Sequence, residues 1–395
     1  MSRRAVPIVV AIALSLAVLG ALAWFGAGGS DDRAKAISTD DGPSSTSSST
    51  STSTTTTTLP VPSSAGAMAL TRTITGDISP KSVVASERGL VFAQNMMYRH
   101  TMTVYDRSGN LVKTIPDTVD LAAYGIAGHP GLVKGAPVEA AFTPDGTHAY
   151  VSNYSMYGAG FGPEGSDDCP ANNSTDSSFL YRVDTKTLAI DGVVPVGKVP
   201  KYVAVTPDGR YVLATNWCGY DLSVVDTATG REVKRIPLGP YPRGIAISPD
   251  SRTAYIAVMG THDIARIDLT SFGVSWIRGV GAGPRHLVLS PDGSALYATL
   301  NGDGKVAKID PVNGVVQYKV STGSQPRSMA ISTDGQSLYV VNYESSDMTK
   351  LAASDLHTVQ TVPTGHHPIG ITYDRTTGAV WVAVYDGSIE IFSSS

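Results

Sequence analysis

Prolines recur every 42 residues along the second half of the chain. They are Pro200, Pro242, Pro284, Pro326 and Pro368, and related copies begin at Pro80 and Pro137. Within a copy, four short runs rich in β-branched residues are bounded by Pro, Asp and Gly, which predicts four strands joined by tight turns. Seven such copies of roughly 40 to 45 residues predict an all-β fold, a seven-bladed β-propeller of four-stranded blades.

The last copy is one strand short, which predicts how the ring closes. It runs through residues 380–383 and 389–392 and then the chain ends. A segment that resembles the missing strand stands at the other end of the repeat region, at residues 69–76. We therefore expect this N-terminal strand to complete the last blade as its outermost strand.

Motifs inside the copies resemble the YVTN β-propeller repeat of cell-surface and surface-layer-type proteins. The resemblance is carried by Tyr-Val-Ser-Asn at 150–153, Tyr-Val-Val-Asn at 339–342 and Ala-Thr-Asn at 214–216, each downstream of a Pro-Asp-Gly or Thr-Asp-Gly turn. It covers about Leu70 to Phe392 and implies a propeller. The wider superfamily includes lactonase-type propellers and propeller domains of quinone- or metal-dependent redox enzymes, so the resemblance implies little about chemistry.

The amino end predicts a membrane segment and a spacer. Residues 1–30 hold a basic start and an uncharged run, 5–29, long enough to cross the roughly 30 Å hydrocarbon core as a helix. We expect an uncleaved signal-anchor, with a cleaved signal peptide as the alternative. Residues 31–68, in which 44–58 are all Ser or Thr, are expected to be a disordered tether, and 69–395 the propeller. These features predict an extracytoplasmic protein anchored to the cell membrane, or a secreted one if the segment is cleaved.

The charge balance excludes one class of partner and points to another. With 30 Lys+Arg against 34 Asp+Glu the net charge is −4, which argues against a nucleic-acid binder. Yet the residue after the anchor proline is basic in five of seven copies: Lys81, Lys201, Arg243, Arg285 and Arg327. We expect these side chains to converge at the mouth of the central channel, where they would attract an anion. The alternative is that each is a consensus residue of the repeat that pairs with a carboxylate of a neighbouring blade or reaches solvent.

Two insertions interrupt the period on one face of the predicted ring. They add 15 residues, mainly within 117–136, and 21 residues, mainly within 154–178. Long loops on a rigid scaffold often bind ligands, although they can also be decoration. Cys169 lies in the second insertion and Cys218 in the equivalent loop of the next blade, so we expect a disulfide between them. A free, nucleophilic thiol is the competing interpretation.

Aromatic and titratable residues are expected on the same face. Tyr154, Trp217 and Tyr343 follow second strands, where they would suit a sugar, an anionic glycan or a peptide, or simply pack. His367, next to an anchor proline, is expected to contribute to ligand binding as well. Glu139 and His286 are weak catalytic candidates, because no spacing pairs them. No motif predicts a cofactor or a metal site.

We therefore predict a binding or interaction module, with the ligand over the channel mouth on the face that carries the insertions. The expected partners are a cell-envelope glycan, a small anion or a protein. One alternative is a lactonase-like hydrolase or lyase that uses Glu139 or a histidine. A structural surface-layer or adhesion protein is the other.

Overall fold

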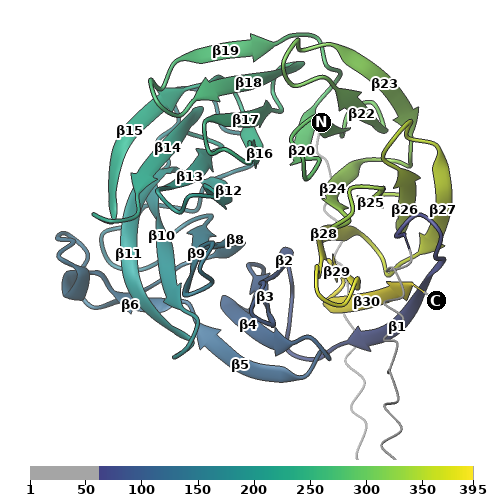
Figure 1. Ribbon diagram of the computed structural model, residues 1–395. Coiled ribbons are helices and arrows are strands. Elements are labelled where there is room, and N and C mark those ends of the chain that lie inside the picture. Colours follow the sequence, from purple (N-terminus) through teal and green to yellow (C-terminus); the bar gives the residue numbers. More distant parts are fainter. Residues whose placement is uncertain (1–61, 395) are drawn as a thin grey trace, which may run out of the picture. The chain divides into compact units, whose positions relative to one another are not determined.

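The computed structural model describes residues 62–394, which form a ring of seven four-stranded antiparallel sheets. Figure 1 looks along the axis of this ring, with the first strand of each blade lining the centre and the fourth at the rim. The predicted seven-bladed β-propeller is therefore confirmed. Each anchor proline from Pro137 onward is the first residue of an innermost strand.

The blades follow one another in chain order. Blade 1 comprises β2 (Ser82–Ala85), β3 (Leu90–Asn95), β4 (Thr101–Asp106) and β5 (Leu111–Pro116); blade 2, β8 (Pro137–Phe142), β9 (His148–Asn153), β10 (Ser177–Asp184) and β11 (Ala189–Lys198); blade 3, β12 (Pro200–Val205), β13 (Tyr211–Asn216), β14 (Asp221–Asp226) and β15 (Arg231–Pro237); blade 4, β16 (Pro242–Ile247), β17 (Thr253–Val258), β18 (Asp263–Asp268) and β19 (Val274–Ile277). Blade 5 comprises β20 (Pro284–Leu289), β21 (Leu296–Leu300), β22 (Lys305–Ile309) and β23 (Val316–Ser321); blade 6, β24 (Pro326–Ile331), β25 (Ser337–Asn342), β26 (Asp347–Ala352) and β27 (Thr358–Pro363); blade 7, β28 (Pro368–Tyr373), β29 (Val380–Val384), β30 (Ser388–Ser394) and β1 (Met68–Ile74).

The two ends of the repeat region share blade 7, as predicted. Strand β1 pairs antiparallel with β30, from Met68 opposite Ser394 to Ile74 opposite Ile389, and Figure 1 shows the two strands side by side at the rim. The strand begins one residue earlier than expected, because the side-chain amide of Gln360 holds the backbone of Met68: it donates to the carbonyl at 3.1 Å and accepts from the N–H at 2.7 Å.

The Pro-Asp-Gly turns join first and second strands on one face, which we call the turn face. In blade 3 the carboxylate of Asp208 accepts from the hydroxyl of Thr206 at 2.6 Å and from the backbone N–H of Arg210 at 3.0 Å. Gly209 has a φ of 73°, which an L side chain rarely adopts. The opposite face, which carries the loops from second to third strand and between blades, is the insert face.

Apolar side chains are buried between neighbouring blades rather than at the axis. Between blades 3 and 4, for example, Leu213 and Leu222 pack against Ile256 and Val258, all fully buried. Because each blade can bury its faces only against its neighbours, the whole ring is needed for a continuous core.

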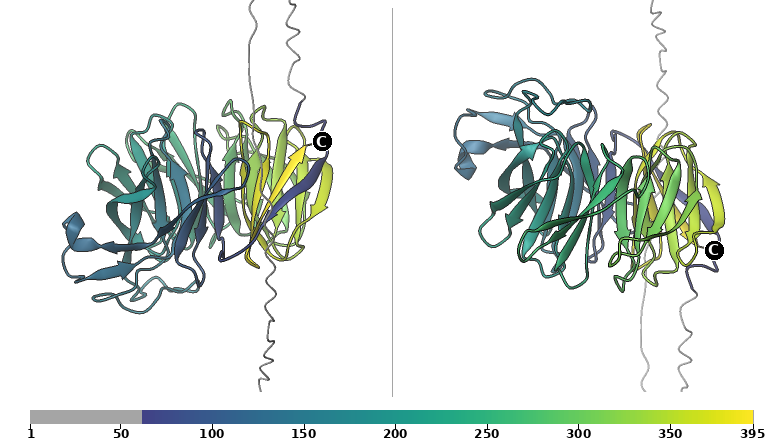
Figure 2. Two further views of the ribbon diagram at one scale, coloured as in Figure 1. Left: turned by 90° about the horizontal axis from the view of Figure 1, so that it is seen from below. Right: turned by 90° about the horizontal axis from the view of Figure 1, so that it is seen from above.

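The insertions lie together on the insert face. The first forms a hairpin, β6 (Thr118–Asp120) and β7 (Leu132–Lys134), with a 3₁₀ turn, η1 (Leu121–Tyr124), and it projects beyond the rim in Figures 1 and 2. The second lies between β9 and β10. A β-bridge between Lys134 and Tyr157 joins them.

The predicted membrane segment, residues 1–30, and residues 31–61 of the predicted tether lie outside the described residues. Within 62–394, no helix is long and apolar enough to span a membrane. The last residues assigned to the tether are bound to the propeller. Ser63 donates its N–H and its hydroxyl to Asp334, each at 2.8 Å.

Candidate functional site

The five predicted basic residues meet at one small cavity on the axis. This mouth cavity has a volume of about 160 Å³ and is lined by Lys81, Lys201, Arg243, Arg285 and Arg327 together with Asp167, Trp217, Met259 and Asn301. Side chains from blades 1, 3, 4, 5 and 6 thus converge, because each stands one residue after its anchor proline. The repeat register therefore places them at one level of the channel.

A recurring backbone motif brings the residue after each second strand to the same level. The residue before the anchor proline has a positive φ in blades 3 to 7, including the β-branched Val199 at 54°. In each case its carbonyl accepts from the backbone N–H of the residue that follows the second strand of its own blade, at 2.9 to 3.0 Å. The residues positioned in this way are Trp217, Met259, Asn301, Tyr343 and Tyr385.

Positive charge at the mouth cavity is poorly compensated. Among the described residues, Lys201 is the one member of the five that forms an ion pair, a short one with Asp167. The side chain of Arg243 hydrogen-bonds to no other residue of 62–394, and Nε of Arg327 is buried without a partner there. Arg285 donates instead to the carbonyl of Arg327 at 3.2 Å. The predicted alternative, a carboxylate for each cation, is not what the structure has.

Burial and mutual repulsion shift the pKa values of these groups. Burial, opposed by Asp167 and reinforced by Arg243, lowers the pKa of Lys201 from 10.5 to about 7. Burial and the charges of Arg243 and Arg327 lower the pKa of Arg285. Burial and the charges of Arg243 and Arg285 lower the pKa of Lys81. Like charges held together in this way are costly unless a negative charge joins them.

The predicted aromatic residues hold the cations. Nζ of Lys201 lies 3.9 Å from the ring centre of Trp217 and 5.3 Å from that of Tyr154, and the Arg327 guanidinium lies 3.9 Å from Tyr343. His367 stacks on Tyr343 with ring centres 4.1 Å apart. These distances are those of cation–π contacts and ring stacking. The ring faces are therefore used within the protein.

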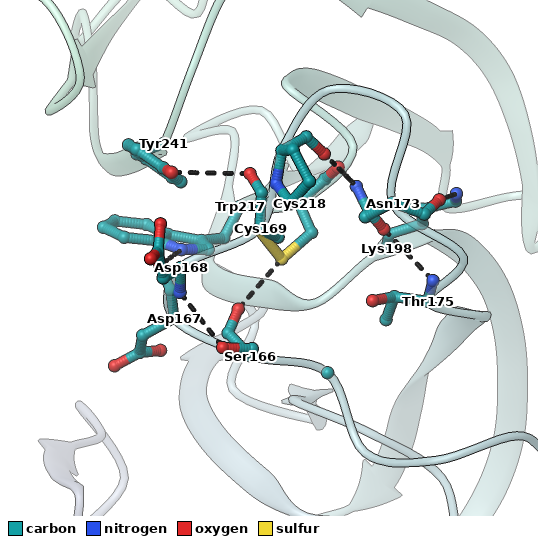
Figure 3. Close-up of a disulfide and its surroundings, with 12 residues drawn as sticks. Ser166, Asp167, Asp168, Cys169, Asn173, Thr175, Lys198, Trp217, Cys218 and Tyr241 are labelled. Atoms are coloured by element: carbon teal, nitrogen blue, oxygen red, sulfur yellow. Dashed lines mark hydrogen bonds between the residues drawn. A yellow bond between two sulfur atoms is a disulfide. The ribbon is translucent and has the colours of Figure 1, made fainter.

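The disulfide between Cys169 and Cys218 forms as predicted and anchors the second insertion over the mouth (Figure 3). It brings Asp167 to the mouth, where the indole N–H of Trp217 donates to the Asp167 carbonyl at 2.8 Å. The Tyr154 hydroxyl shares its proton between the Gly165 carbonyl, at 3.0 Å, and the Asp167 carboxylate, at 3.2 Å. Desolvation opposes ionisation of Asp167, but the charge of Lys201 and its hydrogen bond lower the pKa of Asp167 to about 2.

A second cavity, of about 190 Å³, holds both weak catalytic candidates. We call it the lower cavity; its lining includes Glu139, His286 and Tyr202. Nδ1 of His286 accepts from the backbone N–H of Met329 at 3.3 Å, so the ring proton is on Nε2 and donates to the Tyr202 hydroxyl at 2.9 Å. Burial, with the charges of Arg243 and Arg285, lowers the pKa of His286 to about 3, which keeps it neutral. Burial raises the pKa of Glu139 to about 7, although the charge of Arg243 opposes this.

Tyr202 and Asp167, which form polar contacts in these cavities, are missing from the site predicted from the sequence. Tyr202 stands two residues after its anchor proline, as do Glu139 and His286, so the repeat register carried a signal for it. Asp167 lies in an insertion outside the repeat, and only its position two residues before Cys169 hinted at its place.

Within residues 62–394, one group of possible metal ligands lies outside both cavities, at the turn-face end of blade 2. The ligand atoms of His148, Asp184 and Asp191 are within 4.8 Å of one another. However, Arg182 donates to both oxygens of Asp191, at 2.9 and 3.2 Å, and the backbone N–H of Thr187 donates to Asp184 at 2.6 Å. Both carboxylates of the group therefore already have hydrogen-bond donors within the protein.

Comparison with known proteins supports the fold. The model of the cytochrome D1 heme domain family matches residues 256–389, about a third of the chain. The solved structure of hydrazine synthase from Kuenenia stuttgartiensis superposes with a TM-score of 0.64 at 19% identity, over 80% of this chain and 96% of that one. No curated protein matches the sequence. At this identity the likeness concerns the fold alone.

The residues at the axis do not fit a heme. Ligand pockets usually measure about 300 to 1,000 Å³, whereas the two axial cavities measure about 160 and 190 Å³. In the lower cavity both ring nitrogens of His286 are engaged, one of them with the Tyr202 hydroxyl. At the mouth, the sulfur of Met259 accepts from Arg285 at 4.0 Å. These side chains, of the kinds that hold heme iron, therefore already have partners within residues 62–394.

Proposed function

We propose that this protein binds a small oxyanion carrying two or more negative charges at the mouth cavity. The observation that carries the proposal is the convergence of five cationic side chains on 160 Å³ with one carboxylate among them. An anion there would offset the repulsion among Arg243, Arg285 and Arg327, and guanidinium groups suit the geometry of phosphate, sulfate or carboxylate.

The small volume of the mouth cavity and the contacts that its aromatic rings already make favour a small anion over a glycan. One water occupies roughly 30 Å³ in the liquid, so 160 Å³ holds about five water-sized groups. A sugar would need free aromatic faces, but Lys201 and Arg327 lie over the rings of Trp217 and Tyr343. The ligand we propose is therefore of the size of sulfate, phosphate or oxalate, free or as the terminus of a larger molecule.

Calorimetric titration of the full chain with sulfate, phosphate and oxalate, and with acetate for comparison, tests the proposal. We expect the divalent anions to bind, with affinity that falls as salt rises. Arg243→Gln and Arg285→Gln should each weaken binding about ten- to hundredfold, because a hydrogen bond to a charged group contributes roughly 1.5 to 3 kcal/mol.

Arg266→Gln is the matched control. This arginine belongs to the same chain region but bonds to Ser275 and to the carbonyl of Val312 on the outer part of blade 4. Binding should be unchanged in this variant. Absence of binding in the wild type, or equal loss in all three variants, contradicts the proposal.

We also propose a location and a family for the protein, on the basis of its sequence. We place the propeller outside the cytoplasm on a membrane-anchored tether, as a cell-surface protein with YVTN-type repeats. The apolar run 5–29 and the Ser/Thr run 44–58 support this, and so does the disulfide, since such bonds persist in oxidising compartments. Protease treatment of intact cells, which should remove the propeller, tests it. A structural surface-layer role is compatible with the same location, and absence of anion binding would favour it.

Acid–base catalysis by a lactonase-like hydrolase or lyase is the second candidate function. It is favoured by Glu139, whose pKa of about 7 suits proton transfer near neutral pH, beside the Tyr202–His286 pair. If it is correct, Glu139→Gln abolishes turnover of a small lactone or acid substrate while sulfate binding is retained.

A further inference from the structure

Asp167 is bound at the mouth cavity as a ligand would be. Its carboxylate contacts Nζ of Lys201, accepts from the Tyr154 hydroxyl at 3.2 Å, and belongs to a loop rather than to a blade. Its charge also acts on Lys81, Arg285 and Arg327, whose cationic forms it favours. Thus a single carboxylate, which belongs to an insertion, interacts electrostatically with cations from several blades.

In the ion pair between Lys201 and Asp167, the lysine side chain is buried and the carboxylate is exposed to solvent. The side chain of Lys201 is 8% exposed and that of Asp167 is 75% exposed. The ammonium of Lys201 lies over the rings of Tyr154 and Trp217, and these contacts favour its position at the mouth. Asp167 can rotate into water, where its carboxylate would be fully solvated, and an incoming anion then replaces it as the partner of the buried ammonium.

The loop itself is attached by contacts that do not involve this carboxylate. Besides the disulfide, the Trp217 indole donates to the Asp167 carbonyl, Asn173 donates to the carbonyl of Cys218 at 2.8 Å, and the Tyr220 hydroxyl donates to that of Cys169 (Figure 3 shows the first two). The backbone therefore keeps the Asp167 carboxylate close to Lys201 even when the ion pair is broken, at a high effective concentration.

We infer that the Asp167 carboxylate occupies one end of the anion site in the ligand-free protein and that the bound oxyanion replaces it on Lys201. This rests on the proposed function. The tethered carboxylate then acts as a built-in competitor, and it sets which anions bind. A ligand must contact Arg243, Arg285 and Arg327 as well as Lys201 to displace it, which a compact dianion can do and a single carboxylate cannot match.

Removing the competitor should tighten binding. Apparent affinity is reduced by the fraction of protein in which the site is blocked, so pairing of Lys201 for nine-tenths of the time would weaken binding about tenfold. We therefore expect Asp167→Asn to bind sulfate about tenfold more tightly than the wild type. Asp168→Asn is the matched control, because Asp168 is the adjacent, exposed carboxylate and forms no ion pair with any residue of 62–394.

A double-mutant cycle with Lys201→Met separates replacement from a general effect of charge. If Asp167 competes for Lys201, Asp167→Asn changes sulfate affinity by no more than about twofold in the Lys201→Met background, since only screened charge remains to act. If Lys201→Met binds no sulfate, the double variant must bind none either. A tenfold gain from Asp167→Asn in both backgrounds, or recovery of binding in the double variant, overturns the inference.

The outcomes also distinguish this inference from the proposed function. Sulfate binding by the wild type with no gain, or a loss, in Asp167→Asn overturns the inference alone. Failure of the wild type and of Asp167→Asn to bind sulfate, phosphate or oxalate overturns both. Binding by Asp167→Asn when the wild type binds none of these anions contradicts the proposed function, while it supports competition by Asp167.

Discussion

The hydroxyl of Tyr202 and Nε2 of His286 lie 2.9 Å apart although the residues are 84 positions apart in the chain. The number is twice the 42-residue period, so the two side chains occupy equivalent positions in blades 3 and 5 and meet across the lower cavity. The neutral histidine donates to the tyrosine, whose own proton is then free to face the cavity that contains Glu139. A layer of neutral hydrogen-bonding groups thus lines the channel next to the layer of cations.

Glu139→Gln should remove a pH dependence of stability. Because burial raises the pKa of Glu139 from 4.5 to about 7 in the folded protein, the folded state holds a proton that the unfolded chain releases between these values. The free energy of unfolding of the wild type therefore falls as pH rises from about 4.5 to about 7, and the variant lacks this fall. Urea unfolding at pH 5 and pH 7.5 measures it.

Glu232→Gln, on the outer strand of blade 3, is the control for this change and should keep the wild-type pH dependence. Lys201, whose pKa is lowered to about 7, acts with the opposite sign and at higher pH, because the unfolded chain binds its proton up to about pH 10.5. An identical pH profile in wild type and Glu139→Gln would show that Glu139 is ionised in the folded protein.

Trp217→Leu should weaken sulfate binding about three- to tenfold. The change removes the ring 3.9 Å from Nζ of Lys201, and a cation–π contact of this kind contributes roughly 0.5 to 2 kcal/mol to holding the cation in place. Calorimetric titration measures the loss. Trp276→Leu is the control, since Trp276 makes the same type of contact with Arg278, at 4.6 Å, on the outermost strand of blade 4. Equal effects of the two changes would contradict a role for Trp217 at the mouth.

The disulfide should stabilise the protein by about 2 to 4 kcal/mol, because it closes a loop between residues separated by 49 positions. We expect Cys169→Ser with Cys218→Ser to lower the free energy of unfolding by this amount. A reducing agent should lower the wild-type value to that of the double variant and leave the double variant unchanged. Full stability in the double variant would mean that the hydrogen bonds of the insertion suffice.

The 42-residue period predicts the fold and the position of the site. It does not predict the direction in which each side chain points. Equal spacing places Lys201, Arg243 and Arg285 at one level of a ring, so their convergence was predictable. In a regular strand, however, consecutive side chains point to opposite faces. Six innermost strands have a register shift just after the anchor proline. Such irregularities re-aim side chains, and here both the first and the second residue after the proline line the channel.

The sequence also did not predict the long-range contacts that irregular segments make. Nothing in the repeat indicates that Asp167 returns to Lys201, because an insertion has no register with the blades. The same holds for the use of Trp217 and Tyr343, whose rings the sequence could assign to a ligand as readily as to a cation. The structure assigns them to Lys201 and Arg327.

Lys350→Met should destabilise the closure of the ring at its N-terminal strand. Lys350 is 1% exposed, and its Nζ donates to the carbonyl of Ser63 at 2.6 Å and to that of Gly66, so it holds the segment that leads into β1. Loss of the ammonium leaves two carbonyls without this donor, which costs about 1 to 3 kcal/mol.

Lys308→Met is the control, because Lys308 stands 42 residues earlier, at the equivalent position of blade 5, and donates to the exposed Ser354 carbonyl at 2.6 Å. Urea unfolding should show a change of less than about 0.5 kcal/mol for this variant. In a chain that begins at Met68, the effect of Lys350→Met on the free energy of unfolding should vanish, since the carbonyls that Lys350 serves are gone; an effect that persists would mean that Lys350 acts through packing within blade 6.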